Sequence, residues 1–272
     1  MRREIDSEKC LEIHEEGDGF FELERRRVSF IVRSKIRKLV GNRKLGVAWL
    51  ILDPVVISLI YLFVFIVIRS NPNPETIFIG ISLFRVMQST FLGGTQFLSD
   101  FTAGLRVERV SSSSIRMSTV RFRFIDSFLQ SFGVGVVLLL FFESDVSAVL
   151  YFFIIAQLIG FLFEGFGISL FILVKRVPDM QNIFRYAFQL LFFASPCLYP
   201  LSKAEGLHYR ANEFNPFSYF VESVRMVFGL DSTFNEMSME VLVILFVLLS
   251  FMSLRGYMKI DAIRWEVSRW GN

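Results

Sequence analysis

Residues Arg37–Ile68 read RKLVGNRKLGVAWLILDPVVISLIYLFVFIVI, a basic polar stretch that stops at Lys44 and is followed by a long apolar run. Only Asp53, Pro54 and Ser58 interrupt this run. An α-helix rises 1.5 Å per residue, so about 20 residues cross the ~30 Å hydrocarbon core of a bilayer. The stretch therefore predicts a transmembrane helix over residues 47–68 that is entered from a positively charged side.

The composition agrees with a membrane protein. The chain has 272 residues, of which 53% are hydrophobic and 33 are phenylalanine. The mean hydropathy is +0.50, whereas a soluble domain of this length has fewer apolar residues and no such long runs. The net charge is only +3, so the composition does not indicate a nucleic-acid partner.

The cysteines and histidines are too few and too scattered to predict a disulfide framework or a metal site. They are Cys10, Cys197, His14 and His208. The first 20 residues are acidic and polar without an apolar core, so no removable signal peptide is expected. Because no Ser/His/Asp, Cys/His or HExxH arrangement is present, we expect a chain that is not itself an enzyme and binds no metal or cofactor.

Five further apolar stretches follow the first one. They predict an all-α polytopic membrane protein with six transmembrane helices, over residues 47–68, 76–98, 119–142, 146–174, 182–199 and 239–254. In the fourth span, Gly160, Gly165 and Gly167 allow neighbouring helices to approach closely. An even number of spans places both termini on one side of the membrane.

Basic residues indicate which side this is. They concentrate in residues 25–44, in the loops after the second and fourth spans, and in the C-terminal tail, whereas the opposite loops carry few. Cytoplasmic segments carry the excess of Lys and Arg, so we expect both termini in the cytoplasm and the chain in the cytoplasmic membrane. Residues 1–24, which are charged and mixed in sign, are then a cytoplasmic tail.

The basic segment before the first span predicts an amphipathic interface helix. Its apolar positions recur at mostly three- and four-residue spacing; they are Val28, Ile31, Val32, Ile36, Leu39 and Val40. Such a helix suits the membrane surface. A plain juxtamembrane anchor without a partner is the alternative, and the sequence leaves it open.

A second amphipathic helix is expected between the fifth and sixth spans. Asn215-Pro216 marks a turn and a helix start, and Gly229 lies where a C-cap is expected. This helix either enters the membrane and returns, as re-entrant segments do, or lies flat on the outer surface. The candidate outer gate consists of Asn215, Pro216, Phe217 and Phe220.

Three motifs follow one another along the chain. They are a basic amphipathic lead with Leu45-Gly46-x-x-Trp49-x-x-x-x-Pro54, the segment Phe192-Phe193-Ala194-Ser195-Pro196-x-x-Tyr199-Pro200-Leu201, and Asn215-Pro216 with the stretch that runs to Arg225. In their order, their spacing and the six-span frame, residues 28–260 resemble the transmembrane subunits of ABC-2 type exporters of polysaccharides, such as the capsule, O-antigen and teichoic-acid permeases. The resemblance implies that residues 25–272 form an ABC-2 type transmembrane domain.

The resemblance also implies a mechanism. These permeases pair as dimers with two copies of a separate ATP-binding subunit and carry a lipid-linked glycan across the cytoplasmic membrane. This chain has no GxxxxGK(S/T) phosphate loop, so the partner subunit uses the ATP and Mg²⁺.

The family's contacts with the ATP-binding subunit correspond here to the interface helix and the loop Ser99–Ser118. Arg106, Glu108 and Arg109 are the candidate coupling residues. The alternative, that these arginines only set the topology, does not explain the length of the loop. The run Ser111–Ser114 departs from the apolar and basic stretch expected there, and we interpret it as a flexible linker.

Aromatic residues in the first span are candidate contacts for a glycan, because the C–H faces of sugars stack on aromatic rings. The candidate path residues are Trp49, Tyr61, Phe63, Phe65 and Arg85. Most membrane phenylalanines face lipid or pack between helices, so Trp49 and Tyr61 are the favoured pair.

Among the charged residues inside the expected spans, Asp53, Arg85, Asp126 and Glu164 are candidates for a functional or pairing role, because an ionised side chain there is costly. Arg121 and Arg123, just inside the third span, belong with the basic residues that indicate the topology. Arg85, near the middle of the second span, either meets the phosphate or pyrophosphate of a lipid-linked substrate or pairs with an acid on a neighbouring helix. Pairing is favoured, because no family motif covers this position.

Other classes of membrane protein fit less well. A secondary transporter usually shows an internal repeat, and a channel needs a filter signature; neither is visible. The alternatives that stay open are an ABC-2 exporter of a drug or small lipid-like molecule and a charge-coupled secondary transporter. The aromatic face of the first span favours the sugar polymer.

Overall fold

The computed structural model describes residues 17–41, 45–69, 74–97, 112–260 and 262. Within these residues every regular element is helical, as the sequence predicts. The elements are α2 (Gly17–Val40), α3 (Ala48–Arg69), α4 (Pro74–Thr95), α5 (Ser112–Phe141), α6 (Val146–Ser169), α7 (Phe171–Arg176), α8 (Met180–Ala194), the 3₁₀ turn η2 (Leu201–Lys203), α9 (Gly206–Glu213), α10 (Pro216–Val227) and α11 (Met239–Met258).

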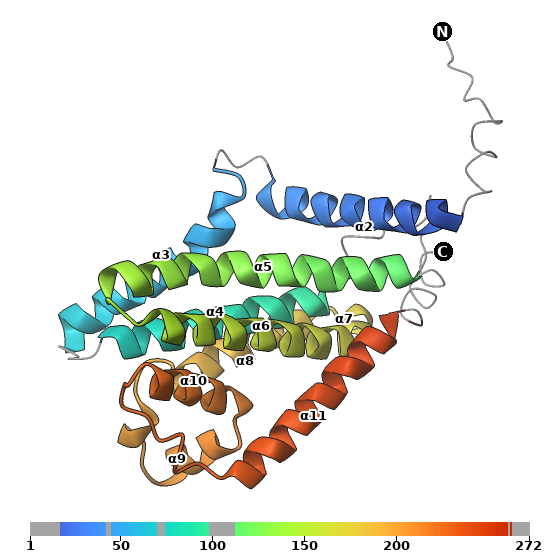
Figure 1. The fold of residues 1–272 in the computed structure, drawn as a ribbon. Coiled ribbons are helices and arrows are strands. Elements are labelled where there is room, and N and C mark those ends of the chain that lie inside the picture. Colours follow the sequence, from blue (N-terminus) through green and yellow to red (C-terminus); the bar gives the residue numbers. More distant parts are fainter. Residues whose placement is uncertain (1–16, 42–44, 70–73, 98–111, 261, 263–272) are drawn as a thin grey trace.

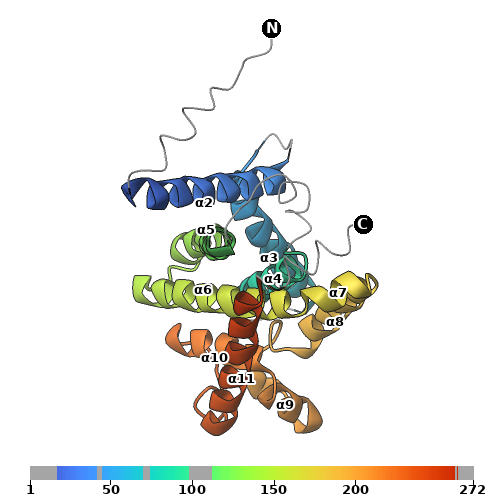
Figure 2. The ribbon, with the colours of Figure 1, turned by 90° about the vertical axis from the view of Figure 1, so that its right-hand side faces the viewer.

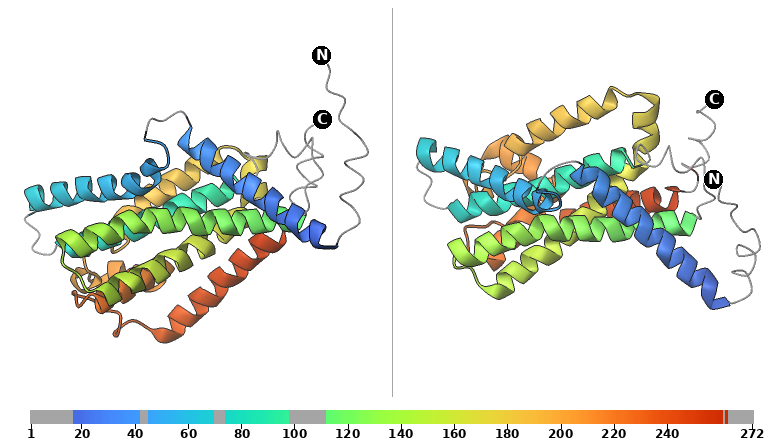
Figure 3. Two further views of the ribbon diagram at one scale, coloured as in Figure 1. Left: turned by 45° about the horizontal axis from the view of Figure 1, so that its top comes forward. Right: turned by 90° about the horizontal axis from the view of Figure 1, so that it is seen from above.

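The helices form layers (Figure 1). α2 lies on one side of the molecule and α9 and α10 on the other, with α4 and α6 between them, and the view along the bundle agrees (Figure 2). α2 crosses α5 obliquely, and α5 and α8 lie on opposite sides of α4 (Figure 3). The start of α2 and the end of α11 are found at the same end of the bundle.

Four described helices are long and apolar enough to cross a membrane, namely α4, α5, α6 and α11. The expected first span corresponds to α3, which has 22 residues and whose described side chains form an apolar stretch over Ala48–Val64. The expected fifth span corresponds to a shorter element, because α8 has 15 residues, which is about 22 Å of helix. The chain is therefore a multi-pass membrane protein, and the count of six spans stays a prediction.

The N-terminal ends of two helices differ from the prediction. α2 begins at Gly17 and so includes residues assigned to the tail. α5 begins at Ser112 rather than near residue 119, so the serine run provides its first turn and is not a flexible linker. Ser113 Oγ donates to Glu24 Oε1 over 2.9 Å, which ties this turn to α2.

The expected fourth and fifth spans also end earlier. The fourth span, 146–174, breaks at Leu170, whose N–H donates to Gly167 O three residues back instead of continuing the α-helical pattern. The fifth span, 182–199, ends at Ala194 because Ser195 is extended (ψ 159°). Pro196 follows directly, and the residue before a proline disfavours the α conformation.

Glycines set the separation between α6 and its neighbours. Gly167 faces Gly94 of α4, and Gly165 faces Gly256 of α11; a Cβ at any of these positions would overlap the backbone of the other helix. Gly160 lies equally close to α5. The prediction that the three glycines of the fourth span allow close helix contact is confirmed.

α10 is enclosed by the protein. Nine of its twelve residues, Phe217–Arg225, are buried, and the helix packs on α4 and α6. Asn215 Oδ1 accepts the N–H of Phe217 over 3.1 Å as the N-cap, and Gly229, with φ 67°, ends the helix as predicted. A helix lying flat on the surface would expose one face along its length, so this burial favours the re-entrant alternative.

We expect Gly256→Val to lower the stability of the folded chain, because the new side chain would force α11 away from α6. Overpacking of this kind costs about 1–3 kcal/mol. The measurement is the thermal unfolding midpoint of the purified chain in mild detergent. Leu254→Val is the matched control, since Leu254 lies on the same helix and is 60% exposed. Equal midpoints for both variants would contradict the close contact.

Candidate functional site

A cavity of about 770 Å³ lies between α3, α4, α5 and α8. Gly46 and Gln96 line one end of the cavity, and Tyr61 and Phe193 line the other end. Along α3 the distance from Trp49 to Tyr61 is twelve residues, or about 18 Å. The cavity is thus elongated along the bundle and passes the middle of α4.

α3 contributes both aromatic and acidic groups to the lining. Trp49, Asp53 and Tyr61 line the cavity. Phe63 does not; it is 67% exposed on another face of the helix. Phe65 lies in α3, but its side chain is outside the described part of the chain. Of the aromatic residues predicted for the path, Trp49 and Tyr61 therefore line one cavity.

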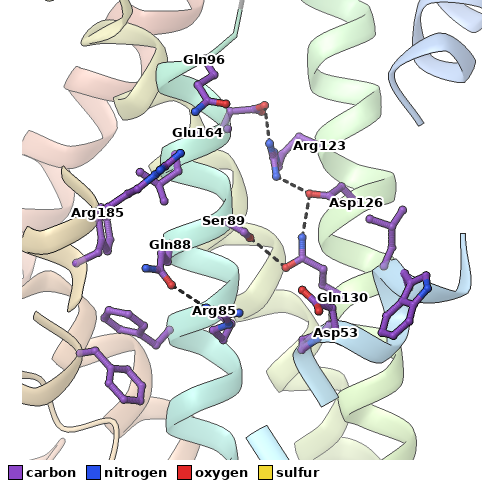
Figure 4. A pocket seen from close by; sticks show the side chains of 18 of the residues that line it. Asp53, Arg85, Gln88, Ser89, Gln96, Arg123, Asp126, Gln130, Glu164 and Arg185 are labelled. Carbon is purple, nitrogen blue, oxygen red and sulfur yellow. Dashed lines mark hydrogen bonds and ion pairs between the residues drawn. The ribbon is translucent and has the colours of Figure 1, made fainter. Parts of the chain in front are cut away.

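Arg85 lines the same cavity from α4. Its Nη1 donates to Gln88 Oε1, on the same helix, over 3.1 Å (Figure 4). Among the described residues Arg85 forms no ion pair. The expected pairing of Arg85 with an acid on a neighbouring helix is thus not observed there.

Two of the acids inside the spans, Asp126 and Glu164, pair instead with Arg123 of α5. Arg123 Nη1 donates to Asp126 Oδ2 over 2.7 Å, and Nη2 donates to Glu164 Oε1 of α6 over 2.9 Å (Figure 4). All three side chains are buried. In the low dielectric of a helix bundle such charges require partners, and this cluster fastens α5 to α6.

Hydrogen bonds extend this cluster to two further helices. Tyr257 of α11 donates to Glu164 Oε2 over 3.0 Å. On the other side, Gln130 Nε2 donates to Asp126 Oδ2 over 2.9 Å, and Ser89 Oγ of α4 donates to Gln130 Oε1 over 3.1 Å. One polar network therefore connects α11, α6, α5 and α4 beside the cavity.

Arg123 is a buried charge in this cluster. From the sequence it is only one of the basic residues that indicate the topology. The signal for the cluster was present, because Arg123, Asp126 and Gln130 follow at i, i+3 and i+7 and so share one helix face. Arg185 and Gln189 of α8, which line the cavity, were also missed. These two are spaced i, i+4 within the expected fifth span.

Aromatic rings pack together at the end of the cavity that Tyr61 lines. The Phe84 ring lies 5.1 Å from that of Phe192 and 5.4 Å from that of Phe217, between ring centroids. Tyr61 lies 5.0 Å from Phe192. The cluster joins α3, α4, α8 and α10, so the predicted gate residue Phe217 is in direct contact with the cavity wall.

The remaining gate residues hold the start of α10. Asn215 Nδ2 donates to Ser195 Oγ over 2.8 Å, which joins the second and third sequence motifs in space. Pro216 occupies the first turn of α10, where its missing N–H costs no helical hydrogen bond. Phe220 is buried in the core. The second and third motifs therefore form one folded unit, whose Phe192 and Phe193 also line the cavity.

A buried ion pair holds this unit against α4. Arg225 Nη1 donates to Glu222 Oε1 over 2.8 Å, and neither side chain is exposed. Arg225 Nη2 donates to Thr76 O over 3.0 Å at the start of α4. Desolvation lowers the pKa of the Arg225 guanidinium, and the charge of Glu222 opposes this shift. Glu222 also accepts the N–H of Thr233 over 2.9 Å.

The predicted coupling residues Arg106, Glu108 and Arg109 lie outside the described residues. In the described part of the chain, α2 packs Val28 and Val32 against Phe122 of α5. The apolar stripe predicted for the interface helix therefore contacts protein. Within the described ranges no group of three His, Cys, Asp or Glu residues could hold a metal ion.

Comparison with known families gives one match. A family model described as "ABC-2 type transporter" matches residues 26–229, which is most of the chain. No curated protein matches the sequence.

We expect Arg123→Gln to destabilise the chain strongly, because it leaves Asp126 and Glu164 buried without their cation. Breaking a buried pair in this way costs about 3–5 kcal/mol. Arg85→Gln is the matched control: it removes one hydrogen bond within α4, worth roughly 1 kcal/mol. The measurement is the thermal unfolding midpoint in detergent. Similar losses in both variants would show that Arg123 does not hold the bundle together.

We expect Glu222→Gln to loosen the segment between α8 and α11, because Arg225 then keeps a buried charge without a counter-ion. Limited proteolysis should cut residues 200–238 faster than in the wild-type chain. Glu205→Gln is the control, since Glu205 is an exposed acid in the same segment. Cutting rates that stay at the wild-type level in Glu222→Gln would contradict the role of the pair.

Proposed function

The chain belongs to the ABC-2 type transporter family and is a permease subunit of an ABC transporter, and we propose that it exports a lipid-linked polysaccharide or glycoconjugate across the cytoplasmic membrane. The observation that carries this proposal is the composition of the cavity. Trp49 and Tyr61 face a space that also contains Arg85 and several amide side chains. Aromatic rings suit the C–H faces of sugars, and the polar groups suit their hydroxyls.

The energy comes from a separate subunit in this proposal. ABC-2 permeases typically work with an ATP-binding subunit, and this chain has no phosphate loop of its own. We assign two such subunits, which use ATP and Mg²⁺, and a second copy of the chain. Arg106, Glu108 and Arg109 are proposed to dock the ATP-binding subunit. α2 and the cytoplasmic end of α5 would then receive its movement, because Glu24 and Ser113 link them.

The outer gate is proposed to be the aromatic cluster and the start of α10. Phe217 contacts Phe84, and Asn215 and Pro216 fix where α10 begins. A shift of α10 relative to α4 would therefore open or close the outer end of the cavity. We propose that both termini lie in the cytoplasm, as the distribution of basic residues favours.

Export of a drug or small lipid-like molecule is the second candidate. It is supported by the cavity volume of about 770 Å³, which lies in the usual range of small-molecule pockets, roughly 300–1,000 Å³. A polymer must instead pass through the cavity one segment at a time. The two candidates differ in what accumulates when the chain is removed.

The experiment combines purification with deletion. The chain is extracted in mild detergent, and mass spectrometry identifies what co-purifies. A stoichiometric subunit with a phosphate loop, together with accumulation of a lipid-linked glycan inside cells that lack the chain, supports the proposal. Accumulation of a small apolar compound favours the second candidate. The absence of an ATP-binding partner, even after crosslinking before extraction, would contradict the proposed energy source.

We expect Tyr61→Ala to reduce export of the glycan roughly two- to tenfold, as loss of one aromatic contact predicts. Phe63→Ala is the matched control, because Phe63 lies on the same helix outside the cavity lining. The measurement is the amount of glycan at the cell surface at equal protein levels. If the two variants export equally well, the Tyr61 face of α3 is not part of the path.

A further inference from the structure

Two guanidinium groups in the cavity wall, those of Arg85 and Arg185, form no ion pair within the described part of the chain. Arg123 provides the contrast. It lies in the same wall and binds two carboxylates. A charge at membrane depth is costly unless a partner compensates it. The bundle supplies that partner for Arg123 and leaves the other two cations facing the cavity.

Arg85 and Arg185 lie at different levels of the cavity wall. Phe91 lies 5.3 Å from Phe184 and 5.0 Å from Phe188, and Phe84 lies 6.1 Å from Phe188, between ring centroids. Arg85 directly follows Phe84 on α4, and Arg185 directly follows Phe184 on α8, so about two turns of α4 separate the two levels. Arg185 extends from α8 toward α4, and Gln88 lies between the levels of Arg185 and Arg85 (Figure 4).

The acids of the cavity cannot fully balance these cations. Lys35, Arg85, Arg123 and Arg185 line the cavity together with Asp53, Asp126 and Glu164, which gives one net positive charge. Asp126 and Glu164 are already bound to Arg123. Of the acids in the described part of the lining, only Asp53 remains to face Arg85 and Arg185, so an added anion would improve the charge balance of the site.

We propose that Arg85 and Arg185 together bind a phosphate or diphosphate group carried by a lipid. The planar guanidinium fork matches phosphate oxygens with paired hydrogen bonds. Gln88 strengthens the site, because its Oε1 already accepts from Arg85 and its Nε2 is left to donate to a phosphate oxygen. The inference rests on the proposed function and names the part of the substrate that this site recognises: the link between lipid and glycan.

The apolar surroundings suit the lipid part. Phe193 of α8 both lines the cavity and is 58% exposed at its edge. Leu190, one turn earlier on α8, is also exposed. An acyl or isoprenoid chain could therefore leave the cavity past α8 while its phosphate stays between the two arginines.

The test is a binding measurement on the full chain in nanodiscs of phosphatidylcholine, with radiolabelled farnesyl diphosphate as the probe and farnesol as the phosphate-free comparison. We expect farnesyl diphosphate to bind more tightly than farnesol. Arg85→Gln and Arg185→Gln should each weaken its binding about tenfold, the usual effect of losing a charge-assisted hydrogen bond. Arg185→Lys should retain part of the affinity, because it keeps the charge but loses the fork.

Arg210→Gln on α9 is the matched control, since this exposed arginine lies outside the cavity lining. Wild-type affinity in Arg85→Gln and Arg185→Gln, or equal binding of farnesyl diphosphate and farnesol, would overturn the site. If either result is obtained while an ATP-binding subunit still co-purifies, the phosphate site is wrong but the proposed permease function stands. A second set of nanodiscs containing phosphatidylglycerol identifies the source: strong competition assigns the phosphate to a phospholipid headgroup, and weak competition assigns it to the transported lipid.

Discussion

The pairing of Arg123 with Asp126 and Glu164 is the interaction on which the rest of the bundle depends. It places three ionised groups between helices, where each would be costly alone and where together they fasten α5 to α6. Through Tyr257 and Gln130 the same cluster reaches α11 and the wall of α4. Because this cluster uses the nearby acids, Arg85 and Arg185 face the cavity without ion pairs among the described residues. The electrostatics that hold the helices together thus also define the chemistry of the cavity.

Two features position this cavity within the membrane domain. On one side, glycine contacts bring α4, α6 and α11 so close that these helices form a compact core. On the other side, α3 and α8 contact α4 along a narrower area and leave space between them. The Phe84, Phe192 and Phe217 rings pack together at the end of the cavity that Tyr61 lines, and α10 is held in place by the Glu222–Arg225 pair. In the proposed mechanism, a movement of α2 and α5 would reach this aromatic cluster through the polar network on α5 and through α4.

Much of the fold could be predicted from the sequence, because hydrophobic length and glycine spacing act locally. The long apolar runs gave the helices, and Asn215-Pro216 and Gly229 gave the limits of α10. The helix ends at Ser112, Leu170 and Ala194 could not be predicted as well, since tertiary contacts and a following proline decide them. The site was predicted in part. Trp49, Tyr61 and Arg85 share one cavity, whereas Phe63 points elsewhere, because two residues, about half a turn of helix, separate Tyr61 from Phe63. The pairing of Arg123 with Glu164 and the place of Arg185 in the cavity lining depend on contacts between helices, which a single sequence does not specify.

The central claim is that the cavity between α3 and α8 carries a phosphate-linked glycolipid. The most direct measurement places a photo-crosslinking amino acid at Leu92, which lines the cavity, and identifies the adducts formed in living cells by mass spectrometry. Val247 on α11, which is 60% exposed, provides the comparison with bulk lipid. The account predicts a glycan-bearing lipid phosphate at Leu92 and only ordinary phospholipid at Val247. Identical phospholipid adducts at both positions, in cells that are exporting, would contradict it.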